Sequence, residues 1–319
     1  MNQDRENFQI AYKAALILAI LTFLNILFGP MVRATDSGLA CPDWPLCYGK
    51  FIPPPEFRIW MEVGHRFYSG IISIILLLLV IKVFRTKVLT EKIGTLTIVA
   101  IGVIAMQIIL GMLTVTKLLD PTTVNLHLLN AVLFLLTIIT IAIVCKIQLE
   151  EEKYPNSKFR FTIIFQNGNG LLVILFLLIY YQMFLGGRVS SHYAGLICGG
   201  FPLCNGEWFP KMTGLVRYHM EHRITAYLIF FLLLWYYIKS LKVETVPILK
   251  KFAGISLLVC VVQIILGIVN VLYGLPVIVT GFHTGTAALL LVSVYISLYL
   301  RMAILIPTLE LETNQVTAT

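Results

Sequence analysis

Eight long apolar stretches dominate the sequence and limit what the chain can fold into. They cover residues 12–32, 63–83, 94–116, 123–145, 164–186, 220–240, 252–273 and 277–300. A helix needs about 20 mostly apolar residues to cross the ~30 Å hydrocarbon core of a bilayer. The stretches are continuous rather than alternating, which argues against barrel strands, and only helices or closed barrels satisfy their backbone in lipid. The sequence therefore predicts an all-α polytopic membrane protein with eight transmembrane helices.

The composition excludes the soluble classes of protein. The 319 residues are 58% hydrophobic and 13% charged, whereas ordinary soluble domains have roughly 45–50% and about 25%. A mean hydropathy of +0.88 is too high for the apolar residues to fit inside one soluble core. These values exclude a water-soluble domain and a disordered chain.

The basic residues set the expected orientation in the membrane. Of the 24 Lys and Arg residues, 15 lie near the two ends of the chain or in three loops, at 82–93, 146–162 and 239–251. Cytoplasmic loops carry such an excess, so we expect both termini to be cytoplasmic. The N-terminus lacks the character of a mitochondrial transit peptide, which favours the plasma membrane of a bacterium or archaeon. The net charge of +8 follows from this topology, so no nucleic acid is expected as a partner.

The two halves of the sequence repeat each other. The segment SGLACPDWPLCYGKFIP at 37–53 resembles AGLICGGFPLCNGEWFP at 194–210, and QIILG occurs at both 107–111 and 263–267. Each half holds four spans, so both enter the membrane in the same sense, unlike the inverted repeats of many transporters. We expect two tandem four-helix bundles related by a pseudo-two-fold axis along the membrane normal. The predicted parts are an N-terminal half at 1–146, a cytoplasmic connecting loop at 147–162 and a C-terminal half at 163–319.

Four of the six histidines belong to this repeat, near the outer ends of the second and fourth span of each half: His65, His127, His222 and His283. Two imidazoles facing each other across a helical bundle are typical of a bis-His haem site. Hydrogen bonding between helices is the alternative, and two pairs at matched depth favour haem. Zinc is disfavoured because each half lacks an obvious third ligand. Gln107 and Gln263, in mid-span, are expected to hydrogen-bond between helices.

Glu62 is the most informative single residue. It precedes His65 by three residues, so both project from one face of their helix, and a carboxylate there could move a proton beside a haem. The alternative is an acid favoured by the dipole of the helix N-terminus. The repeat aligns Glu62 with His219, so the two halves are expected to do different work. His192, in an outer loop, is expected to be an ordinary polar residue.

Two arginines follow ligand candidates directly in the sequence. Arg66 and Arg223 could pair with haem propionates, because guanidinium matches carboxylate geometry. The alternative is that they extend to the membrane interface.

Four of the six cysteines form two C-x5-C pairs, both in outer loops. The outer side of a bacterial membrane is oxidising and permits disulfides. Four cysteines allow three connectivities, and the spacing and the repeat favour Cys41–Cys47 and Cys198–Cys204. Cys145 and Cys260 are expected to be small buried residues.

These residues carry a resemblance to a known family. The run VRATDSGLACPDWPLC at 32–47, the sequence Glu62-x-x-His65-Arg66 and the four span histidines closely resemble haem A synthase, over nearly the whole chain. The resemblance implies oxidation of the C8 methyl group of haem O to a formyl group, by two hydroxylations and loss of water from a geminal diol. It implies water as the oxygen source, because bis-His ligation leaves no open iron position.

The resemblance also implies a role for each site residue. His65 and His127 would hold the substrate haem, and His222 and His283 would hold a permanent haem b through which electrons leave. Glu62 would be the catalytic acid and base. Partners would be haem O, lipid, haem O synthase, factors of terminal oxidase assembly and a second copy of the chain. One departure is that Arg33 aligns with Ser190, which leaves contacts around the haem b open.

Two alternatives remain at the level of sequence. A di-haem b-type cytochrome that carries electrons between quinol and a partner shares the histidine pairs and does not need Glu62. A transporter or channel with structural histidines binds no haem.

Overall fold

The computed structural model describes residues 2–151, 169–244 and 246–302. It confirms the predicted class, because the described residues form eight helices long and apolar enough to span a membrane and no strand. The helices are α1 (Asn2–Ala34), α2 (Phe57–Phe84), α3 (Lys87–Thr116), α4 (Pro121–Leu149), α5 (Asn169–Ser191), α6 (Gly214–Val243), α7 (Pro247–Leu272) and α8 (Val277–Leu300).

Most helices extend beyond the apolar stretches that predict them. α2 begins at Phe57 rather than at 63, α5 ends at Ser191 rather than at 186, and α6 begins at Gly214 rather than at 220. Hydrophobicity marks the part of a helix that lies in lipid, whereas capping and turn residues decide where the hydrogen-bonded helix ends. Residues 164–168 of the fifth predicted span, and most of the predicted connecting loop, lie outside the described residues.

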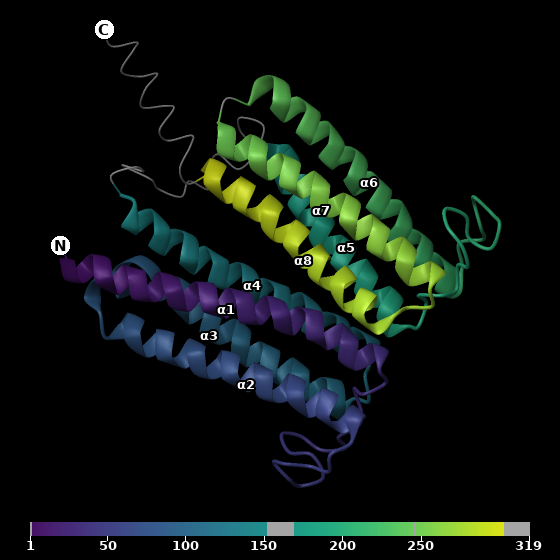
Figure 1. Cartoon of the computed structure of the whole chain (residues 1–319), viewed down its shortest axis with the longest axis horizontal. Coiled ribbons are helices and arrows are strands. Elements are labelled where there is room, and N and C mark those ends of the chain that lie inside the picture. Colours follow the sequence, from purple (N-terminus) through teal and green to yellow (C-terminus); the bar gives the residue numbers. More distant parts are fainter. Residues whose placement is uncertain (1, 152–168, 245, 303–319) are drawn as a thin grey trace.

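The helices gather in sequence order. Figure 1 shows α1 to α4 lying together and α5 to α8 lying together. The two groups meet where α1 packs against α8 and where α4 packs against α5. The predicted symmetry axis stays a prediction.

The helix α4 contributes to two apolar cores. Its Phe134 and Ile138 are buried in a core shared with α1, α2 and α3. Its Val132 and Leu135 are buried in a second core, with residues of α5, α6, α7 and α8. Because α4 faces both cores, it lies at the boundary between the two groups of helices.

Glycines bring the two groups into close contact. A Cβ on Gly281 or Gly285 of α8 would collide with Met31 or Leu27 of α1. On the other side, the Asn125 amide of α4 donates to a backbone carbonyl of α5 and fills the space beside Gly187. Small residues allow this approach between membrane helices.

Two long loops cover one end of the helices. One loop joins α1 to α2 and the other joins α5 to α6, and Figure 1 shows both at the end opposite the N-terminus. Each loop contains a cis X-Pro bond, at Trp44-Pro45 and at Phe201-Pro202. Each also closes a disulfide, Cys41–Cys47 and Cys198–Cys204, as the spacing and the repeat predicted.

Candidate functional site

The four repeat histidines lie at matched depths in four helices. His65 and His222 follow the first residues of α2 and α6 by eight positions. His127 and His283 follow the first residues of α4 and α8 by six positions. At 1.5 Å per residue, all four lie roughly 9–12 Å along their helices, near the end that carries the disulfide loops.

The imidazoles of His222 and His283 are spaced like two ligands of one metal ion. The ring centroids of His222 and His283 lie 6.3 Å apart, with an angle of 71° between the ring planes. A metal–imidazole bond is roughly 2 Å long. Two such bonds, together with the distance from each nitrogen to the centre of its ring, place the two ring centroids about this far apart. The separation of the two rings therefore matches that of two imidazoles bound to one iron.

The donor chemistry of the site also fits haem. In the part of the chain that the structure describes, no cluster of three or more His, Cys, Asp or Glu could hold a bare metal ion. A pair of imidazoles without a third protein ligand suits an iron whose other ligands come from a porphyrin.

Two glutamines contact the ligand candidates from the neighbouring helix. Gln107 Nε2 lies 3.2 Å from His127 Nε2, and Gln263 Nε2 lies 3.3 Å from His283 Nε2. These contacts join α3 to α4 and α7 to α8, which confirms the expected hydrogen bonding between helices.

The side chain of Asn130 fixes the direction of the first of these contacts. Its amide donates to the Val103 carbonyl at 3.0 Å and to Gln107 Oε1 at 2.8 Å. Gln107 therefore presents its NH₂ group to His127, whose Nε2 must accept. His127 is then a neutral imidazole with its lone pair on Nε2, the form that binds a metal through this nitrogen. In the second half Thr286 takes the place of Asn130 and donates to Gln263 Oε1.

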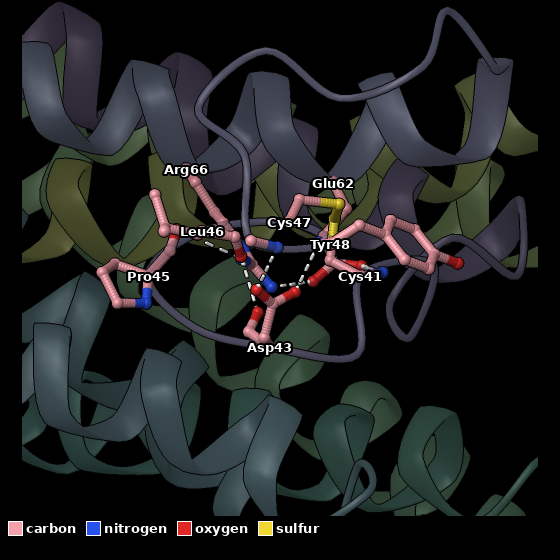
Figure 2. Close-up of a disulfide and its surroundings, with 9 residues drawn as sticks. Cys41, Asp43, Pro45, Leu46, Cys47, Tyr48, Glu62 and Arg66 are labelled. Carbon is pink, nitrogen blue, oxygen red and sulfur yellow. Dashed lines mark hydrogen bonds and ion pairs between the residues drawn. A yellow bond between two sulfur atoms is a disulfide. The ribbon is translucent and has the colours of Figure 1, made fainter.

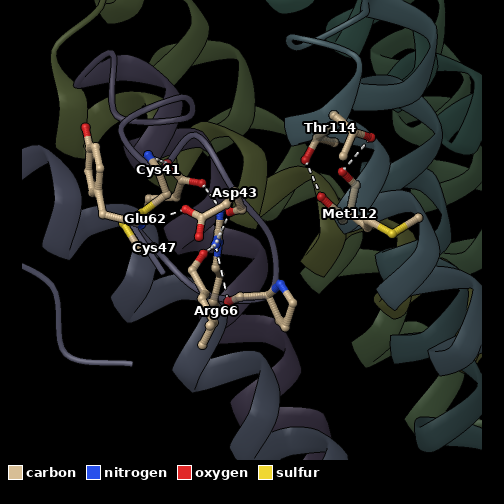
Figure 3. Close-up of polar contacts among 12 residues, drawn as sticks. Cys41, Asp43, Cys47, Glu62, Arg66, Met112 and Thr114 are labelled. Carbon is tan, nitrogen blue, oxygen red and sulfur yellow. Dashed lines mark hydrogen bonds and ion pairs between the residues drawn. A yellow bond between two sulfur atoms is a disulfide. The ribbon is translucent and has the colours of Figure 1, made fainter. Parts of the chain in front are cut away.

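Glu62 lies under the first disulfide loop. The residue is 5% exposed, and its Oε2 accepts a 2.9 Å hydrogen bond from the backbone amide of Cys41. Its Oε1 forms an ion pair with Arg66, one turn further along α2. Figure 2 and Figure 3 show the carboxylate between the Cys41–Cys47 disulfide and the guanidinium group.

Arg66 and Arg223 hold the two loops in place. Arg66 Nη1 donates to the carbonyls of Asp43 at 3.0 Å and Leu46 at 2.7 Å. Arg223 donates to several carbonyls of the second loop, those of Cys198, Gly200, Pro202 and Leu203. From the sequence, these arginines were expected to pair with haem propionates or to extend to the membrane interface. The loop carbonyls were missed as partners, and the only signal for them was that each Arg follows a histidine by one residue in both halves.

The loop residue Asp43 accepts hydrogen bonds from the amides of Gly49 at 2.8 Å and Tyr48 at 2.6 Å. These two backbone bonds, that of Gly49 first, hold the pKa of the carboxyl below its ordinary value of 3.8. The turn that follows Cys47 is thus organised around a charged carboxylate.

His219 takes the position of Glu62 in the second half and binds its loop differently. The residue is 4% exposed, and its Nδ1 lies 2.9 Å from the carbonyl oxygen of Ala194. His192 contacts the Arg188 carbonyl and packs against the Tyr218 ring. Both histidines therefore have partners within the second half. The free cysteines, Cys145 and Cys260, are buried, as expected.

The chain is similar to known proteins over most of its length. A family described as "Cytochrome oxidase assembly protein" matches residues 12–58 and 55–295. The haem A synthase of Shewanella oneidensis is 30% identical over 87% of this chain and 92% of its own length. The chain belongs to the haem A synthase family. The haem A synthases of Halalkalibacterium halodurans, 29% identical over 79% of this chain and 82% of that protein, and of Shouchella clausii, 28% identical over 91% and 96%, are further relatives.

Membership of the haem A synthase family confirms the resemblance found in the sequence. It makes the chain an oxidoreductase whose chemistry involves haem. With the eight apolar helices, it also makes the chain a multi-pass membrane protein.

Proposed function

We propose that this chain oxidises the C8 methyl group of haem O to the formyl group of haem A. The observation that carries the proposal is the placement of Glu62. A buried carboxylate lies three residues from His65 on one face of α2, where the loop amide and Arg66 fix it. The second half keeps both histidines and has no acid at this position.

The two histidine pairs divide the work between the halves. His65 and His127 hold haem O, and His222 and His283 hold a haem b. When bound, this haem b supplies a redox centre that accepts the electrons released by oxidation. The 6.3 Å spacing of the second ring pair supports this assignment. Residues 1–146 are thus the catalytic half and residues 163–319 the electron-accepting half.

Glu62 serves as the proton acceptor at the substrate. Each hydroxylation with water replaces a C–H bond by a C–O bond and releases two protons and two electrons. A carboxylate within reach of the methyl group can take a proton as the electrons depart. Two such steps give a geminal diol, and loss of water then leaves the formyl group. Water would be the oxygen source, because His65 and His127 would together occupy the iron of the bound haem.

The neighbours of Glu62 keep it in one position for this step. The Cys41 amide holds one carboxylate oxygen and Arg66 holds the other, so the side chain does not rotate freely. Positioned groups of this kind contribute typically 10²–10⁴-fold to a proton-transfer rate.

The site lies toward the outer side of the membrane. The basic loop at 82–93 and the N-terminus are at the end opposite the disulfide loops, and basic residues mark the cytoplasmic side. Both termini are then cytoplasmic. Substrate supply requires haem O synthase, and product use requires the assembly factors of a terminal oxidase. A homo-oligomer is a further expectation.

Haem extraction tests this function. The chain is purified from cells that also make haem O, and its pigments are separated by chromatography. Haem A together with haem b is the expected result. Haem b without any haem A would support instead a cytochrome that only carries electrons, and absence of haem would support a transporter or channel.

Histidine variants test the division between the halves. His222→Ala and His283→Ala are expected to remove haem b, because each removes one axial ligand. His65→Ala and His127→Ala are expected to keep much of the haem b and to stop haem A formation. Equal loss of haem b from all four variants would contradict the assignment.

A further inference from the structure

Each of the four ligand candidates faces a glycine of the preceding helix. The pairs are Gly29 of α1 with His65, Gly111 of α3 with His127, Gly186 of α5 with His222, and Gly267 of α7 with His283. In every pair the atom nearest the glycine is Cε1, the ring carbon between the two nitrogens. The four rings therefore pack against a neighbouring helix in the same manner.

The approach is close in three of the four pairs. A Cβ placed on the glycine would lie 3.2 Å from Cε1 at Gly111, and 3.1 Å at both Gly186 and Gly267. At Gly29 the distance would be 3.7 Å. Carbon atoms in contact usually lie about 3.5–4.0 Å apart. An alanine would therefore force the ring to move at three sites and would fit beside His65.

Helix formation gives no reason for these glycines. Glycine in a helix interior is destabilising relative to alanine, and other helical glycines, Gly70, Gly102 and Gly170, have open space where a Cβ would be. The glycines facing the histidines also recur at the offsets of the repeat, 29 with 186 and 111 with 267. The common factor is the ring that each one contacts.

Packing also replaces the usual means of orienting such a ring. A metal-binding histidine almost always donates its second ring nitrogen to a carboxylate, carbonyl or water. Here the Nδ1 atoms of all four histidines lack a protein partner. On the Cε1 side of each ring, the glycine surface is a contact that limits the tilt of the ring.

We propose that Gly111, Gly186 and Gly267 are positioning residues that set the orientation of three axial ligands, and that the wider spacing at Gly29 leaves His65 more room on its Cε1 side. The proposal rests on the ligand assignment of the proposed function. The second half has two closely packed ligands, which suits a permanent haem b. The first half has one closely packed and one looser ligand, which suits a haem that must enter as substrate and leave as product.

Alanine variants of the second half test the proposal. Gly186→Ala and Gly267→Ala are compared with Gly170→Ala, which lies in α5 with open space around its Cβ. The measurements are haem b per protein, the visible spectrum and the electron paramagnetic resonance of the low-spin iron. We expect a roughly 10-fold loss of haem affinity, the lower end for a lost supporting contact, with altered low-spin signals in the haem that remains. Gly170→Ala is expected to match the parent protein in all three.

Far-UV circular dichroism separates a displaced ring from a lost fold. Alanine has the higher helix propensity, so the helical signal of each variant is expected to equal or exceed that of the parent. A helical protein with less haem and altered signals supports the proposal. A variant that loses helix together with haem overturns it, since the glycine would then serve the fold rather than the ligand.

The first half supplies a graded comparison. Gly111→Ala is expected to weaken retention of haem O much more than Gly29→Ala, with Gly102→Ala of α3 as the control in open space. Equal effects at Gly29 and Gly111 would show that the distance to Cε1 is not the cause.

The histidine variants distinguish an error in the ligand assignment from an error in the glycine proposal. If His222→Ala and His283→Ala lose haem b while both glycine variants keep it with the parent spectrum, the ligand assignment stands and the glycine proposal is wrong. If the histidine variants keep haem b, the ligand assignment itself is wrong.

Discussion

The backbone amide of Cys41 donates a 2.9 Å hydrogen bond to Oε2 of Glu62. This bond attaches the proposed proton acceptor to the disulfide loop, because Cys41 is also bonded to Cys47. Arg66 closes the arrangement, since it pairs with Glu62 and donates to two loop carbonyls. The position of the carboxylate thus depends on the loop as well as on α2.

Replacement of Glu62 is expected to stop the reaction and leave the protein intact. Glu62→Gln keeps the size of the side chain and removes the proton acceptor, so haem b and the helical fold are expected to remain. Haem A is expected to fall at least 100-fold, the lower limit for loss of a general base. Haem O or a partly oxidised haem would stay bound. The measurement is haem A formed per unit of folded protein.

His219 is the matched control, because it has the same place in the second half. His219→Ala loses the contact with the Ala194 carbonyl and is expected to reduce haem A formation far less. Near-normal haem A from Glu62→Gln, or a complete block from His219→Ala with haem b retained, would reverse the proposed roles of the halves.

The two disulfides are expected to affect different functions. Replacing Cys41 and Cys47 together by Ser frees the loop that holds Glu62, so haem A formation should fall while haem b stays. Replacing Cys198 and Cys204 together frees the loop held by Arg223, so haem b should be bound less tightly. Peptide mapping of unreduced protein tests the pairing first. Free thiols at all four positions would contradict it.

The fold was predictable from the sequence because lipid leaves few choices. A span of about 20 apolar residues in a bilayer has to be a helix unless a barrel closes. The repeat then placed His65 and His222, and His127 and His283, at equal positions in their helices, which the structure confirms. Periodicity and spacing are sufficient for features that lie within one helix.

Contacts with the loops were not predictable in this way. Nothing in the periodicity specifies the path of residues 35–56, so the partners of Arg66 and Glu62 in that loop could not be found. The contacts between the glycines and the ligand histidines could not be predicted for a related reason. They depend on which faces of two helices meet, and a sequence of continuous apolar residues does not mark one face.

Arg66 is expected to need its planar guanidinium group. Arg66→Lys keeps the charge but cannot reach Glu62 and the carbonyls of Asp43 and Leu46 together, since lysine carries a single ammonium group. We expect haem A formation to fall roughly 10-fold, the lower end for loss of a supporting contact, with haem b unchanged. The change should appear in the turnover rate rather than in the affinity for haem O. Unchanged turnover would show that the Cys41 amide alone positions Glu62.

Acidification is expected to loosen the first disulfide loop. The hydrogen bonds from Gly49 and Tyr48 hold the folded pKa of Asp43 below 3.8. A depressed pKa stabilises the fold above the unfolded value, and this contribution disappears as the pH falls through the folded value. The melting temperature of the parent should therefore exceed that of Asp43→Asn at neutral pH, and the difference should close below pH 3.8. A difference that stays constant down to that range would mean that the charge of Asp43 has no part in holding the loop.

Asn130 is expected to control haem O binding through Gln107. Asn130→Leu removes the donor to Gln107 Oε1, so the glutamine amide can turn and present its oxygen to His127. The imidazole would then favour the tautomer with hydrogen on Nε2, which leaves no lone pair on that nitrogen for iron. We expect haem O affinity to fall roughly 10-fold, measured by titration of the purified protein, while haem b remains.

Thr137→Val is the control for this variant, because it removes a hydrogen bond to the Leu133 carbonyl elsewhere on α4. The equivalent variant of the second half, Thr286→Val, should weaken haem b instead, since Thr286 donates to Gln263. The outcome that would contradict this prediction is an effect on the haem of the other half. Loss of haem b from Asn130→Leu, with haem O binding intact, would mean that Gln107 does not set the ring of His127 and that the two halves are coupled through α4.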